Sequence, residues 1–422
     1  MRSRVSRLPN ELTVATTEMP HSASVSVGLW VGIGARFEPA PLNGICHFIE
    51  HLLFKGTARR SAREISQEVE GVGGYLNAFT SEEATCFHAR APYGQFERLL
   101  DVLMDMLLES RFAATDVNKE REVIKEEIAM YLDEPQHHVQ ELLNATLWPG
   151  QPLGRPITGT ATTLKTMSGR CLRDYLRDHY TAGSIVVAVA GRAHHGQVLR
   201  AVKRYARHLP IGPRPSMPRA RAWQLTPKVC LLRRRIEQTQ LALGIRTCSR
   251  HDDRRYALRL FNVLLGENMS SRLFQSVRED RALAYSIYST PSSFEDAGDL
   301  VISAGLDTDN VPKALRVILR ELRRFTEAPP SAAELRRARD FVLGQMDLAS
   351  ESTETQMNWL GEQLLGYGRI FDLAEIKRCL CAVTPSQIRA VARDFLRRQH
   401  LNLALVSPLK SERGLAELLC IL

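Results

Sequence analysis

Two histidines and a glutamate stand close together in the segment Gly44-Ile-Cys-His-Phe-Ile-Glu-His51. His47, Glu50 and His51 have the spacing H-x-x-E-H. On an α-helix, with about 100° between successive residues, these three side chains project from one arc of the surface. Two imidazoles one turn apart can bind a single metal ion, and a carboxylate beside them can reach a water molecule close to that ion. The pattern therefore predicts hydrolysis by a metal-activated water.

The residues around the two histidines are apolar, so the helix that carries them is expected to be mostly buried. Burying two imidazoles and a carboxylate without partners is costly, and a metal ion removes that cost. The alternative is a helix whose polar residues are exposed, or two core histidines satisfied by hydrogen bonds. Catalytic zinc sites usually have three protein ligands, so a third ligand is expected from elsewhere in the chain.

A second segment that could supply this ligand is Lys119-Glu-Arg-Glu-Val-Ile-Lys-Glu-Glu-Ile128. On a helix, Glu120 and Glu127 are seven residues apart and lie on the same face, two turns from each other. Glu122 and Glu126 point elsewhere. So many charges are also typical of a solvated helix face, and the segment by itself favours that interpretation.

The elements that must position these residues can be predicted from the spacing of apolar residues. In the first half, the patterns indicate a strand at 24–33, helices at 44–54 and from Ser61, a hairpin at 75–90, long helices at 93–109 and 116–132, and a buried strand at 184–190. Ser61 and Glu64 have the form of a capping box.

A proline-rich segment divides the chain almost in half. Residues 209–220 contain four prolines, which break helices and strands alike, so we expect domains at 1–212 and 213–422. The second half repeats the order of elements, with a strand at 238–245, a helix at 256–265, capping boxes at Ser331 and Thr384, and a late strand at 401–406. The predicted fold is α+β, with two similar α/β-roll domains, each a mixed, mainly antiparallel sheet covered by helices.

Composition excludes several classes of protein. The 422 residues carry a net charge of +9, but their basic runs are short and interleaved with acids, so no nucleic-acid partner is expected. No apolar run approaches the roughly 20 residues that span a membrane. We expect no secretory signal, and no transit peptide because strand-like sequence follows the arginines of the first ten residues too closely. The eight scattered cysteines are typical of reduced thiols, so the predicted location is cytoplasmic.

Taken together, these segments resemble the M16 metallopeptidases, the pitrilysin or inverzincin family, and especially its short processing-peptidase-like members. The resemblance spans nearly the whole chain. It rests on four motifs in the family's order, which are the metal helix at 43–57, the substrate-edge strand at 73–85, the third-ligand helix at 120–128 and the arginine–tyrosine segment at 269–285. One departure is Glu11, which stands where relatives usually have a glycine in a turn.

This resemblance implies a role for each residue of the metal site. His47, His51 and Glu127 would hold one Zn²⁺ per chain, and Glu50 would be the general base. Glu120 would orient a ligand histidine through a hydrogen bond. The second half has Arg259-Leu-Phe-Asn262 at the equivalent helix, so it would bind no metal.

The resemblance also implies how a peptide would bind. Asn77 and Ala78 would present backbone and amide groups to an extended peptide that adds to the sheet as a strand, although Asn77 could instead be a turn residue. Arg278 and Tyr285 would contact the substrate carbonyl and stabilise the oxyanion, and the alternative is a surface arginine and a core tyrosine.

In the family, this arginine–tyrosine pair faces the metal domain of the other half of a closed particle. A short chain supplies half a particle, so it would form a homodimer, or a heterodimer with a related subunit, and would share the pair in trans. The expected function is that of a zinc-dependent endopeptidase acting on unfolded peptides or peptide precursors. The alternative is a non-catalytic or partner-dependent subunit of a peptidase-like heterodimer.

Overall fold

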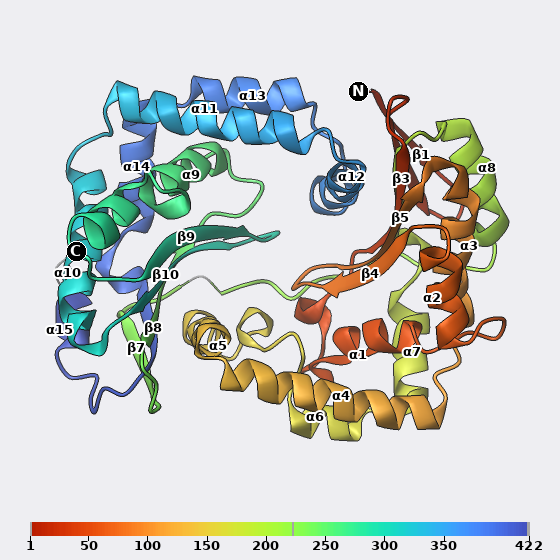
Figure 1. The fold of residues 1–422 in the computed structure, drawn as a ribbon, viewed down its shortest axis with the longest axis horizontal. Coiled ribbons are helices and arrows are strands. Elements are labelled where there is room, and N and C mark those ends of the chain that lie inside the picture. The colour runs from red at the N-terminus through yellow and green to blue at the C-terminus, as the bar shows by residue number, and fades with distance from the viewer. Residues whose placement is uncertain (1, 222, 420–422) are drawn as a thin grey trace. The chain divides into compact units, whose positions relative to one another are not determined.

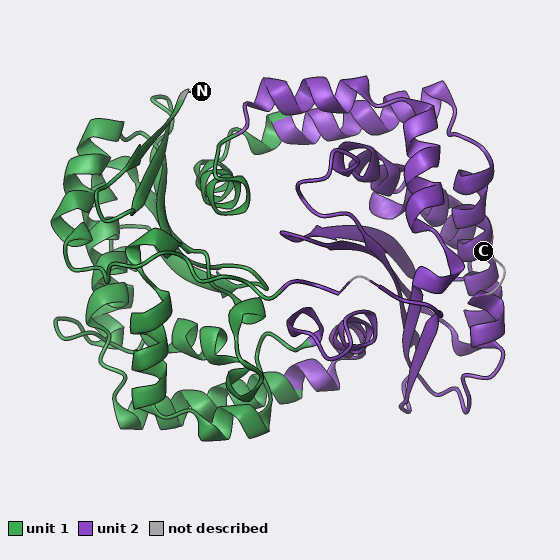
Figure 2. Ribbon diagram, turned by 180° about the vertical axis from the view of Figure 1, so that it is seen from behind, with its two compact units in different colours: residues 1–129, 155–218, 347–370 green, residues 130–154, 219–346, 371–422 purple. Residues whose placement is uncertain are grey.

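The computed structural model describes residues 2–221 and 223–419 (Figure 1). They form two compact units, each built on one sheet (Figure 2). Unit 1 consists of residues 1–129, 155–218 and 347–370, and unit 2 of residues 130–154, 219–346 and 371–422. The predicted α+β class is confirmed, because both sheets are mixed and covered by helices.

The sheet of unit 1 has six strands in the order β1-β2-β6-β3-β5-β4. Its strands are β1 (Arg2–Arg7), β2 (Thr13–Glu18), β3 (Ser24–Val31), β4 (Tyr75–Thr80), β5 (Thr85–Pro92) and β6 (Ile185–Gly191). Only the pairing of β2 with β6 is parallel among these strands. Every residue of β6 is buried, which explains its continuous apolar sequence. Strand β4 lies at one edge of the sheet.

Helices cover both faces of this sheet (Figure 1). The main core lies between one face and a group of helices, namely α1 (Ile45–Leu53), α2 (Ala62–Glu70), α3 (Phe96–Glu109), α4 (Ala114–Asp133), α6 (Ala161–Thr166), α7 (Gly169–His179) and α8 (His195–Ala206). Helix α12 (Thr353–Tyr367) packs on the other face. It can approach closely because a Cβ atom at Gly361 would lie 2.3 Å from the ring of Trp30 on β3.

Unit 2 has a five-stranded sheet in the order β7-β11-β8-β10-β9. Its strands are β7 (Lys228–Arg233), β8 (Thr239–Thr247), β9 (Ser286–Ser293), β10 (Gly298–Leu306) and β11 (Leu401–Ser407). One face packs on the larger core, to which most of the unit's helices contribute. These are α9 (Arg255–Asn262), α10 (Val311–Glu327), α11 (Ala332–Ala349), α13 (Leu373–Ala382), α14 (Pro385–Phe395) and α15 (Leu415–Leu418).

The other face of the unit 2 sheet is covered by α5 (Pro135–Leu147), through Val139 and Leu143. Helix α5 comes from the first half of the sequence, whereas α12, which covers unit 1, comes from the second half. Each sheet is therefore completed by a helix from the opposite half of the chain, as the positions of α5 and α12 show (Figure 1). Nothing in the sequence pattern indicates this exchange.

Most of the predicted elements are confirmed. The hairpin becomes β4 and β5, and the capping boxes form at Ser61, Ser331 and Thr384. No helix or strand lies between Ala206 and Lys228 in the described part of the proline-rich segment. Among the described residues, no helix is long and apolar enough to cross a membrane.

Candidate metal centre

The start of helix α1 is held by a buried carboxylate. Gly44 precedes the helix with φ of 94°, a left-handed conformation that glycine adopts without strain. The helix has no side-chain cap of its own at Gly44. Glu38 instead accepts hydrogen bonds from the backbone N–H groups of Gly44 at 2.7 Å and Cys46 at 2.9 Å. Burial raises the pKa of Glu38, and these hydrogen bonds oppose the shift. A negative group at this end also suits the helix dipole.

The structure brings His47, His51 and Glu127 together. Glu127 Oε2, on α4, lies 3.7 Å from His47 Nε2 and 3.5 Å from His51 Nε2. Two ligand atoms at about 2.1 Å from a tetrahedral zinc ion would be about 3.4 Å apart, so the three side chains fit one ion. In the described part of the chain, this is the one group of three or more His, Cys, Asp or Glu side chains with such spacing.

Electrostatics also favour a cation at this position. Burial lowers the pKa of His47 to about 4, and the neighbouring His51 adds to the effect. His47 is therefore neutral at pH 7, the form of imidazole that binds metals. Burial would lower the pKa of His51 as well, but its interactions with Glu127 and Glu120 outweigh burial and raise the pKa. The carboxylates thus stabilise positive charge beside these imidazoles.

Glu120 lies two turns before Glu127 on α4 and is buried. Its Oε2 atom is 3.2 Å from His51 Nδ1, so it can accept that N–H and leave Nε2 facing Glu127. The other carboxylate oxygen is 2.9 Å from the Lys55 ammonium. By contrast, His47 Nδ1 is buried without a hydrogen-bond partner in the described residues. Of the two histidines, His51 is therefore the one whose tautomer is fixed by a carboxylate.

Glu50 projects from α1 beside these residues and contacts strand β4. Its Oε2 atom accepts a hydrogen bond from Thr80 Oγ1 at 2.5 Å. Burial raises the pKa of Glu50, Glu127 adds to the rise, and Thr80 and His51 oppose it. A carboxylate with a raised pKa is suited to accept and release a proton.

Strand β4 connects this centre to an open sheet edge, because it pairs only with β5 among the described strands. Asn77 is exposed and Ala78 is half-buried. The Asn77 Oδ1 atom accepts the Ala78 N–H at 2.8 Å. That N–H therefore belongs to the free edge of the strand and is held by the neighbouring side chain.

The structure also brings Arg278 and Tyr285 together, within unit 2. The Arg278 guanidinium lies 5.9 Å from the centre of the Tyr285 ring. Tyr285 directly precedes β9 and is 75% exposed, so it is not a core residue. Its exposure leaves the phenol accessible at the surface of the unit.

Sequence patterns did not identify three residues that support this centre. They are Glu38 at the start of α1, Lys55 beside Glu120, and Thr80 beside Glu50. None belongs to a recognisable spacing with the residue that it contacts. The charge of Lys55, two residues beyond α1, was the one available signal. The turn at Glu11, which departs from the family pattern, has a left-handed φ of 75° at that residue.

Comparison with known proteins gives matches over nearly the whole chain. Residues 13–161 match the family model described as Insulinase (Peptidase family M16), and residues 168–342 match that of the Peptidase M16 inactive domain. An uncharacterised zinc protease of Streptomyces coelicolor is 38% identical over 97% of this chain and 91% of its own. A zinc protease of Bacillus subtilis with the same description is 36% identical over 94% of this chain and 97% of its own.

Solved structures share the fold. A protease from Helicobacter pylori has a TM-score of 0.90 at 19% identity, over 96% of this chain and 100% of its own. A peptidase M16 inactive domain from Pseudomonas fluorescens also has a TM-score of 0.90, at 18% identity, over 97% and 99%. At these identities the two matches show that the fold is shared.

Proposed function

Because the chain belongs to peptidase family M16, we propose that it is a zinc-dependent endopeptidase whose metal is held by His47, His51 and Glu127. The observation that carries this proposal is the approach of Glu127 Oε2 to both Nε2 atoms, at 3.7 Å and 3.5 Å. These separations match ligands of one ion. The names of the curated relatives, which are zinc proteases, support the choice of zinc.

A zinc ion held there would act as a Lewis acid, lowering the pKa of water and polarising the scissile carbonyl. Glu50 takes a proton from the attacking water, whose oxygen bonds to the carbonyl carbon. As the C–N bond breaks, Glu50 passes that proton to the leaving nitrogen. Thr80 keeps the carboxylate in place through its hydrogen bond.

The open edge of β4 suits an extended peptide as the substrate. A peptide strand that adds to this edge would exchange main-chain hydrogen bonds with it. The Ala78 N–H would then leave the Asn77 side chain and donate to a peptide carbonyl. Since only an extended segment can bind in this way, we propose unfolded peptides or peptide precursors as substrates.

The oxyanion would be stabilised by Arg278 and Tyr285 of a second subunit. The exposure of Tyr285 supports this proposal, because the phenol is accessible to another chain. The assembly would be a homodimer, or a heterodimer with a related subunit, with one zinc ion per chain.

The test is to incubate the purified chain with a mixture of unfolded peptides and to map the cuts by mass spectrometry, with and without a chelator. We expect cuts that the chelator abolishes and added zinc restores. A chain that neither contains nor binds zinc would overturn the proposal. A chain that binds zinc but never cuts by itself would instead be a partner-dependent subunit.

The role of Glu50 is tested by Glu50→Gln. This variant should bind zinc as the wild type does and lose hydrolysis by about a thousandfold, because an amide cannot accept the proton. Glu122→Gln is the matched control, since Glu122 is an exposed α4 residue paired with Lys125. Hydrolysis retained by Glu50→Gln would refute the assigned role.

A further inference from the structure

Lys55 is linked to the candidate metal centre through Glu120. Its Nζ atom is 2.9 Å from Glu120 Oε1, while Glu120 Oε2 is 3.2 Å from His51 Nδ1. One carboxylate therefore bridges an ammonium and an imidazole, with one oxygen on each. The Glu120 side chain is 7% exposed and that of Lys55 is 38% exposed, so the carboxylate of this ion pair is buried while the lysine reaches it from the surface.

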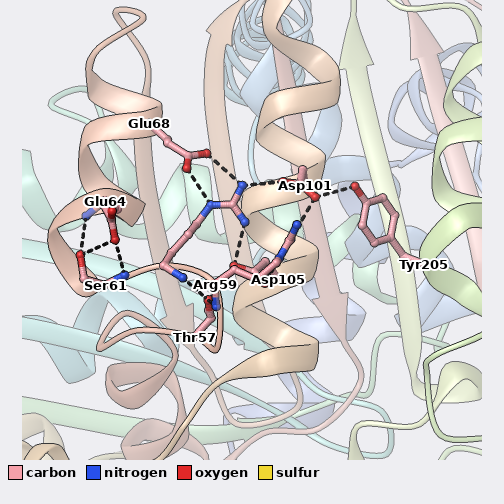
Figure 3. Close-up of polar contacts among 9 residues, drawn as sticks. Thr57, Arg59, Ser61, Glu64, Glu68, Asp101, Asp105 and Tyr205 are labelled. Carbon is pink, nitrogen blue, oxygen red and sulfur yellow. Dashed lines mark hydrogen bonds and ion pairs between the residues drawn. The ribbon is translucent and has the colours of Figure 1, made fainter.

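The position of Lys55 is restricted by the loop that it begins. Its backbone N–H donates to Leu52 O, at the end of α1, at 3.0 Å. The loop is then attached to α3 through Asp105, which accepts from Thr57 Oγ1 at 2.7 Å and Arg59 Nε at 2.8 Å (Figure 3). Arg60 adds a third bond to the same carboxylate. Both ends of this short stretch are therefore anchored, which limits the positions from which the Lys55 ammonium reaches Glu120.

The balance of charges at this site explains why a cation is needed at Lys55. Glu50, Glu120 and Glu127 bring three carboxylates to the surroundings of the two imidazoles. A divalent ion compensates two of these charges, and the Lys55 ammonium compensates the third. A buried carboxylate that loses its cation pays a large desolvation cost, which it reduces by rotating towards solvent or other donors. Either movement would release His51 Nδ1.

We propose that Lys55 is a positioning residue of the metal centre, which holds the Glu120 carboxylate in the orientation that fixes His51 for metal binding. This inference rests on the proposed function, because it requires His51 to be a ligand. Residues that orient metal ligands typically change metal affinity about 10- to 100-fold when they are lost. An ordinary surface ion pair would leave the affinity unchanged.

The first experiment measures zinc affinity by competition with a chelator, which requires no catalytic activity. Lys55→Met should bind zinc about tenfold more weakly than the wild type. Lys55→Arg keeps a cation near Glu120 and should recover most of the loss. Lys125→Met is the matched control, because Lys125 lies on α4 but pairs with the exposed Glu122, and it should bind zinc as the wild type does.

The second experiment asks whether Lys55 acts through Glu120. If it does, Glu120→Gln should weaken zinc binding, and adding Lys55→Met should weaken it little further. Independent, additive losses would overturn the proposal. So would a Lys55→Met variant that binds zinc normally, or one whose zinc-free form unfolds at a much lower temperature, which would indicate a structural role. If the wild type itself binds no zinc, the proposed function fails instead.

Discussion

At the scale of single residues, Glu38 supplies the first turn of α1 with hydrogen-bond acceptors that the helix's own sequence lacks. Gly44 has no side chain with which to cap the helix, and the N–H of Cys46, in the first turn, has no acceptor within the helix. The Glu38 carboxylate accepts from both residues and also from Asn43 Nδ2 at 3.0 Å. Since His47 comes directly after these residues, Glu38 fixes the part of the helix from which this histidine projects.

Glu38→Gln should therefore destabilise unit 1. An amide offers one acceptor oxygen, and its NH₂ group would face a backbone donor, so we expect a loss of about 2 kcal/mol in the free energy of unfolding. The measurement is urea unfolding of zinc-free protein. Glu64→Gln is the matched control, because Glu64 also accepts a backbone N–H at the start of a helix but is exposed. Glutamine can accept the same hydrogen bond in a capping box, so this variant should lose little stability. Equal effects in the two variants would contradict the prediction.

The residues of the site differ in how well sequence predicts them. The H-x-x-E-H spacing predicts a shared face for His47, Glu50 and His51, because one helix fixes their geometry. Glu127 was distinguishable from the other charges of its helix only through the family resemblance. Lys55 and Thr80 were not predicted, because each meets its glutamate partner through tertiary packing rather than through a local pattern.

At the scale of elements, the loop from Lys55 to Ser61 is attached to α3 by ion pairs around Asp105 (Figure 3). Burial alone would raise the pKa of Asp105, but hydrogen bonds from Arg60, Arg59 and Thr57 together outweigh it. The pKa is therefore lower in the folded protein than in the unfolded chain. It follows that the stabilisation is complete above about pH 5, begins to decrease near the unfolded-state pKa of about 4, and is lost as the pH falls through the folded-state pKa.

We predict that Asp105→Asn lowers the free energy of unfolding by about 2 kcal/mol at pH 7. This loss is smaller than that expected for a fully buried ion pair, because the Arg59 side chain is half exposed. The difference from wild type, measured by urea unfolding, should stay constant down to about pH 5 and narrow below about pH 4. Asp178→Asn, which removes an exposed pair with Arg177, should cause no measurable change. A difference that widens in acid would contradict the assigned charge state.

Element boundaries were largely predictable where the chain signals them locally. The capping boxes at Ser61 and Thr384 and the turn at Gly73 mark starts and reversals within a few residues. Contacts between elements that are far apart in the sequence have no such local signal. Helices α5 and α12 each bury apolar residues against one of the two sheets. Close contacts decide between them, such as Gly361 against Trp30, and these are visible only in the folded structure.

At the scale of the whole molecule, the chain carries one candidate metal group in its described residues, in unit 1. The Arg278 and Tyr285 pair lies in unit 2 and is accessible at its surface. Closed oligomers of identical subunits allow such a pair to serve the metal site of a neighbouring chain. In that arrangement, a chain with defective metal ligands can supply its intact arginine–tyrosine pair to a second chain. The second chain, whose own pair is defective, supplies the intact metal ligands.

This compensation can be measured by mixing two inactive variants. His47→Ala removes a metal ligand, and Tyr285→Phe removes a phenol that would stabilise the oxyanion. After subunit exchange, each heterodimer should contain one intact site, made of the metal residues of one chain and the tyrosine of the other. A statistical mixture would then recover about a quarter of wild-type activity, since half of the dimers are mixed and half of their sites are intact.

Mixing His47→Ala with a chain that carries both substitutions is the control and should recover nothing. Verified heterodimers without activity would show that the tyrosine serves its own chain, because sharing in trans requires recovery.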